Sequence, residues 1–145
     1  LSKEELESRY HVRLERYVKD MLIELHTLQQ ITDTLVLPAA YLYSGSLAAS
    51  AAHAKAAGIT EVPQVAAANE VGTLTRELQR HRGELAKAIE RAEAMHDEIE
   101  KQARFLTSDG ADAMEAVRRS SDALELLLSD ELWPLPKYRE MLFPV

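Results

Sequence analysis

The sequence contains no cysteine and little glycine or aromatic residue. The absence of cysteine excludes disulfide bonds and thiolate metal sites. With only 5 glycines in 145 residues and 6% aromatic residues, the composition is weighted instead toward Ala, Leu, Glu, Lys and Arg. These five residues have the highest helix propensities. The composition therefore favours helix over sheet.

The sequence also lacks excess positive charge, since its formal net charge is -7 at pH 7. A chain this acidic gains nothing from releasing the counterions of a phosphate backbone, so we expect no nucleic-acid partner. We find no signal peptide and no run of about 18 uncharged apolar residues, so we expect no membrane span. The chain opens on Leu1 rather than methionine, which indicates a processed or shortened polypeptide. An intracellular location fits these features.

The first predicted helix covers about residues 2–57. Ser2 and Glu5 have the spacing of a capping box, in which a serine cap and a glutamate three residues later satisfy each other's backbone N–H groups. Proline lacks an N–H and clashes with the preceding turn, so Pro38 predicts a kink or break. One apolar stripe follows the three- and four-residue steps of a helix: Leu6, Tyr10, Leu14, Tyr17, Met21, Leu25, Leu28 and Leu35.

Two further helices are predicted over residues 63–106 and 109–130. The first carries a heptad-like seam centred on Leu78 and Leu85, which is typical of helices that pack side by side. It would be roughly 65 Å long at 1.5 Å per residue, longer than a globular domain of this size is wide. Short connections between long helices indicate antiparallel neighbours. We therefore predict an all-α, elongated antiparallel bundle or coiled-coil-like hairpin over residues 1–131.

Residues 132–145 form an apolar, proline-rich tail. Pro134 and Pro136 prevent regular helix there, yet Trp133, Tyr138 and Phe143 are too apolar to be left comfortably in solvent. We predict that Trp133 docks on the helices. The expected receptor is the region near Tyr10 and Tyr17, where an antiparallel third helix would return the chain.

The five histidines allow a metal site to be considered. Glu93 and His96 match the Glu-x-x-His element of di-iron helical bundles, but such sites need a second element and two more inward glutamates. His81 lies on the predicted seam and is better explained as a core or register-setting polar residue. We find no glycine-rich phosphate loop and no Gly-x-Ser-x-Gly turn. The sequence thus predicts no catalytic, cofactor-binding or metal-binding residue.

Three segments of the chain resemble the C-terminal region of type III glutamine synthetases, the long bacterial form. They are residues 7–19 (ESRYHVRLERYVK), Leu37-Pro38-Ala39 followed by Tyr43, and residues 132–143 (LWPLPKYREMLF). The last is the most specific, because such a tail is unusual in other proteins. Residues 48–130 match only in helical character.

The resemblance implies a parent enzyme that makes glutamine from glutamate and ammonia with ATP and magnesium or manganese. It also implies a large cytoplasmic homo-oligomer of stacked rings. The family's catalytic motifs are absent here, so the resemblance assigns this chain a non-catalytic, structural role. Its partners would be the catalytic domain of the parent chain and neighbouring subunits. Two alternatives remain, a free-standing coiled-coil adaptor that binds a partner helix and a di-iron bundle.

Overall fold

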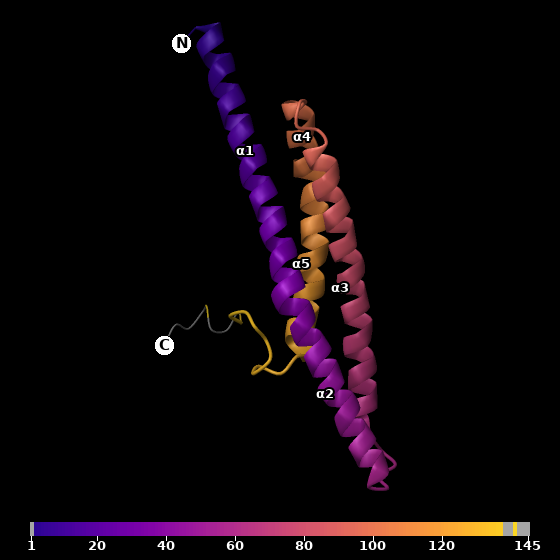
Figure 1. Ribbon diagram of the computed structural model, residues 1–145. Helices are drawn as coiled ribbons and strands as arrows, with labels where there is room; N and C mark the ends of the chain where they lie inside the picture. The colour runs from indigo at the N-terminus through magenta and orange to yellow at the C-terminus, as the bar shows by residue number, and fades with distance from the viewer. Residues whose placement is uncertain (1, 138–140, 142–145) are drawn as a thin grey trace.

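The computed structural model describes residues 2–137 and residue 141, and three long helical rods dominate it (Figure 1). The described residues contain no strand, so the all-α prediction is confirmed. The first rod joins α1 (Lys3–Ile31), η1 (Thr32–Val36) and α2 (Leu37–Ala56). The second is α3 (Pro63–Glu93). The third joins α4 (Ile99–Phe105), η2 (Leu106–Gly110) and α5 (Ala111–Leu127).

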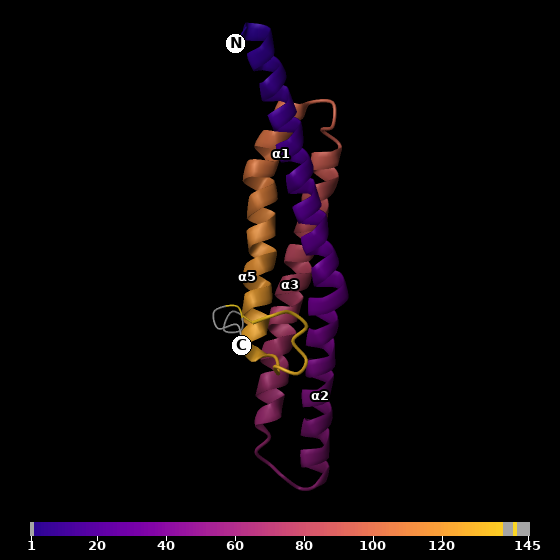
Figure 2. The same ribbon diagram turned by 90° about the vertical axis from the view of Figure 1, so that its left-hand side faces the viewer.

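Successive rods run antiparallel, so the first and third rods point the same way, and α3 is the central one. It packs against α2 on one side and α5 on the other, while α1 packs against α4 and α3. Figure 2 shows the resulting elongated bundle, with the α2–α3 turn at one end and the start of α1 reaching past the other. The core is made mainly of leucine, alanine and valine side chains, and the leucines are its largest fully buried members. Those fully buried are Leu25, Leu78, Leu85, Leu106 and Leu124.

The start of α1 confirms the predicted capping box. The Ser2 hydroxyl accepts a hydrogen bond from the Glu5 backbone N–H at 3.2 Å, and the Glu5 carboxylate accepts one from the Ser2 N–H at 2.9 Å. At the other end of this rod, Gly58 adopts φ 81°, which only glycine reaches without strain. This left-handed residue ends the rod just after Ala56, close to the predicted boundary.

Of the kink or break predicted at Pro38, a break is not found, and a kink stays a prediction. The first rod continues through Pro38, because the chain widens into the π-helical segment η1 immediately before the proline. There the Leu37 N–H bonds to the Thr32 carbonyl, five residues back rather than four. Pro38 then lies in the first turn of α2, where its missing N–H is tolerated.

The predicted helix over 63–106 and turn at 107–110 are also wrong. The α3 helix ends at Glu93, the reversal occurs at residues 94–98, and Leu106–Gly110 is the π-helical segment η2 inside the third rod. Thr107 and Ser108 look like turn residues, but their hydroxyls donate back to the Ala103 and Arg104 carbonyls of the same helix. The third rod accordingly begins at residue 99 rather than 109, and it ends at Leu127 rather than near 130.

Candidate interaction surface

Most of the groups considered for chemistry serve packing instead. Glu93 is the last residue of α3 and His96 lies in the following turn, so the two do not share a helix face. Glu93 binds His26 of α1 at 2.8 Å, and His96 lies 3.3 Å from Asp97. Among the residues that the structure describes, no three His, Asp or Glu side chains gather in a way that could hold a metal ion.

His81 joins two rods. One ring nitrogen, Nε2, lies 2.7 Å from Nη2 of Arg80, and the other, Nδ1, lies 2.7 Å from the Ser120 hydroxyl of α5. An arginine can only donate, so Nε2 must accept and Nδ1 must carry the proton that goes to Ser120. Ser120 itself is buried. The sequence placed His81 on the seam, and the structure shows a polar link across it.

The tail residue Trp133 lies against the bundle and is only 8% exposed. The chain turns at Ser129, whose carbonyl accepts from the N–H groups of Leu132 and Trp133. Lys137 then reaches back, and its ammonium donates to the Glu125 carbonyl at 3.4 Å and to Asp130 at 2.5 Å. The tail is thereby held against the end of α5.

The expected receptor for Trp133 is wrong. Tyr17 bonds to Thr107 at 2.8 Å, which places it beside the start of the third rod. From there to Leu127 the rod runs about 30 Å away at 1.5 Å per residue. The tail emerges at that far end, level with the junction of α1 and α2 in both side views (Figures 1 and 2). Pro134 and Pro136 are exposed, while Tyr138 and Phe143 lie outside the described residues.

The α2 helix has a largely exposed surface whose only charged residue is Lys55 in its last turn. Residues 34–54 contain no Asp, Glu, Lys or Arg. Within the rod Lys3–Ala56, an 18-residue window reaches a mean hydropathy of 1.3 and is 28% buried. By length and composition this rod is apolar enough to cross a membrane, but the core helices of soluble proteins have the same property. The expected absence of a membrane partner stays a prediction.

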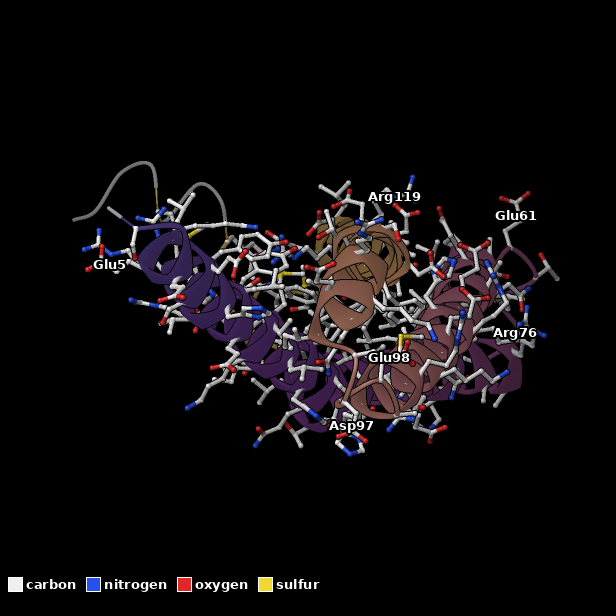
Figure 3. All side chains as sticks on the ribbon, turned by 90° about the horizontal axis from the view of Figure 1, so that it is seen from above. Glu5, Glu61, Arg76, Asp97, Glu98 and Arg119 are labelled. Atoms are coloured by element: carbon white, nitrogen blue, oxygen red, sulfur yellow. The ribbon has the colours of Figure 1, made fainter. Side chains whose placement is uncertain are left out.

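The outer end of α1 forms a second exposed surface. Every described residue from Ser2 to Arg13 is exposed, because α1 leans away from α4 as it leaves the bundle. Figure 3 shows this from above, with Glu5 on the outer end of α1 far from Asp97 and Glu98 in the α3–α4 turn. Between α1 and α4 lies a groove of about 340 Å³, whose lining includes Tyr10, Leu14, Tyr17, Ala103, Arg104 and Thr107.

Comparison with known proteins indicates the family to which the chain is similar. Residues 1–55 match the family described as glutamine synthetase C-terminal domain. The chain is 32% identical to the type-3 glutamine synthetase of Dictyostelium discoideum, over 99% of this chain and 20% of that protein. The chain is a relative of the type-3 glutamine synthetases. The prediction from the three segments is confirmed, including the part of the enzyme to which they belong.

Two further relatives show the same pattern of coverage. The glutamine synthetase of Bacteroides fragilis (strain YCH46) is 32% identical over 96% of this chain and 20% of its own length. That of Butyrivibrio fibrisolvens is 28% identical over 98% of this chain and 20% of its own length. The chain thus spans about a fifth of the curated relatives it matches. No solved structure matches it.

Proposed function

We propose that this chain is the helical C-terminal domain of a type-3 glutamine synthetase and that its role is structural. One observation carries the proposal. The similarity covers nearly all of this chain but only 20% of the Dictyostelium enzyme, as expected for one domain of a longer polypeptide. By this proposal the parent enzyme ligates ammonia to glutamate with ATP and magnesium or manganese. It would be a cytoplasmic homo-oligomer.

The surfaces described above support a contact role. A long bundle whose first helix reaches beyond its neighbours offers more side-chain surface than its own core covers (Figure 1). Among the large apolar residues left exposed are Leu6, Tyr10, Leu42 and Tyr41, all on the first rod. Exposed apolar surface of this kind marks sites of protein–protein contact. The partners we propose are the catalytic part of the same polypeptide and neighbouring subunits.

The proposal can be tested in the full-length enzyme by removing this domain and then supplying it separately. The enzyme without the domain should lose its native assembly and most of its activity, because contacts along the bundle are gone. Co-expression of the domain should restore both. Native mass and γ-glutamyl transferase activity are the measurements. A truncated enzyme with unchanged mass and unchanged activity would contradict a structural role.

The isolated 145-residue chain provides the complementary test. It should show no γ-glutamyl transfer with ATP and either magnesium or manganese, because we assign it no catalytic residue. Turnover by this chain above that of a heat-denatured control would show that part of the active site lies within it. A free-standing adaptor predicts something else, namely a natural polypeptide whose size on an immunoblot is that of the 145 residues alone.

A further inference from the structure

The outer end of α1 carries an apolar stripe that the described part of the bundle leaves exposed. Leu6 and Tyr10 are 60% and 51% exposed, although they continue the stripe that Leu14 and Leu25 direct into the core. The stripe is therefore built like a core-facing surface over its whole length. The bundle covers only its second half, because α1 leans away from α4 (Figure 1).

A projecting helical segment of this length has little stability of its own. Isolated helices shorter than roughly 12–15 residues are marginal in water, and most helices in proteins depend on packing of their apolar face. Every described residue of Ser2–Arg13 is exposed, and of these only Tyr10 lines the groove beside α4. Something that covers Leu6 and Tyr10 would therefore stabilise the segment.

The charges around this surface show what kind of partner fits. Arg9 and Arg13 line a hollow on α1 together with Leu6, Tyr10 and Glu7, and the Glu7 carboxylate pairs with Lys3. Arg104 lines the groove on the α4 side. None of these three arginines forms an ion pair with any described residue. Nearby basic residues are paired instead, as in Lys3–Glu7 at 3.8 Å and Lys101–Glu98 at 3.0 Å.

Three guanidinium groups therefore lie at this surface without an ion pair to any described residue. Glu100 is the one carboxylate that lines the α1–α4 groove, and it also lacks an ion pair among the described residues. It can balance at most one of the arginines. Arginine binds carboxylates through two parallel hydrogen bonds, so the surface is suited to a segment with apolar residues flanked by Asp or Glu.

We propose that the groove between the outer end of α1 and α4 binds an acidic, partly apolar segment of the full-length polypeptide that lies outside these 145 residues. This inference rests on the proposed function, which supplies that polypeptide, since the chain spans 20% of its relatives. A second copy of this chain fits less well. A symmetric contact would bring the same surface to both sides and set arginines against arginines.

The occupant can be identified by photo-crosslinking in the full-length enzyme. A benzophenone amino acid placed at Tyr10 should attach to a peptide from outside residues 1–145, with Asp or Glu next to apolar residues. The matched control is the same group at Val12, which is also exposed, at 62%, but lies on the far side of α1. Attachment within residues 1–145, to a peptide without carboxylates, or equally from Val12 would overturn the proposal.

A charge reversal tests the arginines separately. Arg13→Glu should lower the crosslinking yield from position 10 about threefold or more, because it replaces an attraction to the acidic segment with a repulsion at an exposed site. Lys19→Glu makes the same change of charge on the opposite face of α1 and should leave the yield unchanged. Equal yields in both variants would overturn the assignment. If Tyr10 does not crosslink while removal of the domain still disrupts the enzyme, the surface is wrong and the proposed function stands.

Discussion

Arg82 of α3 binds Asp33 of η1 through two parallel hydrogen bonds. The Nε–Oδ1 distance is 2.7 Å and the Nη2–Oδ2 distance is 2.5 Å. The hydrogen bonding that Arg82 donates to the Asp33 carboxylate is the main reason that the pKa of Arg82 lies above its ordinary value, with a smaller opposing effect of desolvation. This contact ties the widened turn before Pro38 to the central helix.

We expect the Asp33–Arg82 contact to contribute measurably to stability. Both side chains are about a third exposed, at 34% and 35%, so the pair is neither fully screened nor fully desolvated. Asp33→Asn should lower the free energy of unfolding by about 1–2 kcal/mol, and Arg82→Lys by a similar amount because the two-point geometry is lost. Urea denaturation of both variants and their double mutant measures the coupling.

The matched control for this pair is Glu84→Gln. Glu84 binds Arg80 at 2.9 Å, but this pair joins neighbouring turns of one helix and is 50–61% exposed. Its loss should change the free energy of unfolding by no more than about 0.5 kcal/mol. If Asp33→Asn costs no more than Glu84→Gln, the link between η1 and α3 has no special role in stability.

The raised pKa of Arg82 also sets a pH dependence. A group whose pKa is higher in the folded state contributes stability that is fully present below its unfolded pKa and is lost as pH rises through its folded pKa. For arginine both values lie far above neutrality. The stability difference between wild type and Arg82→Lys should therefore stay constant from pH 6 to pH 9. A difference that changes steadily over this range would implicate another titrating group.

The seam of α3 was visible in the sequence because its residues are spaced regularly. Leu78 and Leu85 are fully buried. Their role in stability stays a prediction. Truncation of either to alanine should cost about 2–5 kcal/mol, since a cavity forms between rods that cannot easily close it. Leu126→Ala is the control, because Leu126 is 86% exposed and its loss should change stability by no more than about 0.5 kcal/mol.

The spacing of the apolar residues gave a wrong prediction of the core face where the helix itself is irregular. The stripe predicted that Leu35 faces the core, but Leu35 is 39% exposed and Val36 is buried at 1%. The π-helical segment η1 adds one residue to a turn, which rotates the following side chains by about one position. A pattern with a period of 3.6 contains no sign of such an insertion, so the sequence could place the core face of α1 but not that of α2.

The reversal of the chain at residues 94–98 was not predicted, for a different reason. Ala94, Met95 and His96 favour or tolerate helix, and the segment has neither glycine nor proline, whereas residues 107–110 end in Gly110. Tertiary packing decided against these local preferences. Gln102 is buried and its side-chain amide donates to the Ala92 carbonyl at 2.9 Å, which closes the end of α3 against the start of the third rod. Pairwise contacts of this kind are not readable from spacing.

Trp133 combines burial with an unsatisfied donor. Its indole Nε1 is buried and has no hydrogen-bond partner among the described residues. An unpaired buried N–H costs about 1–3 kcal/mol, whereas the apolar ring contributes by its burial. Trp133→Phe should therefore lower the free energy of unfolding far less than Trp133→Ala, for which about 3–5 kcal/mol is expected. Equal losses in the two variants, by urea denaturation, would mean that burial of an aromatic ring at this position does not contribute to stability.

The fluorescence of Trp133 tests whether the tail is docked in solution. It is the only tryptophan, so its emission reports this one position. At 8% exposure within the apolar core cluster, the indole should emit at a blue-shifted maximum and be poorly quenched by acrylamide. Docking should also depend on the hydrogen bonds that the Lys137 ammonium donates to Asp130 and to the Glu125 carbonyl, because they connect the tail to the end of α5. Lys137→Met should shift the emission toward that of a water-exposed indole, whereas Lys55→Met, a lysine at the exposed end of α2, should not. A water-like maximum with free quenching in the wild-type chain would show that the tail is held only when the rest of the polypeptide is present.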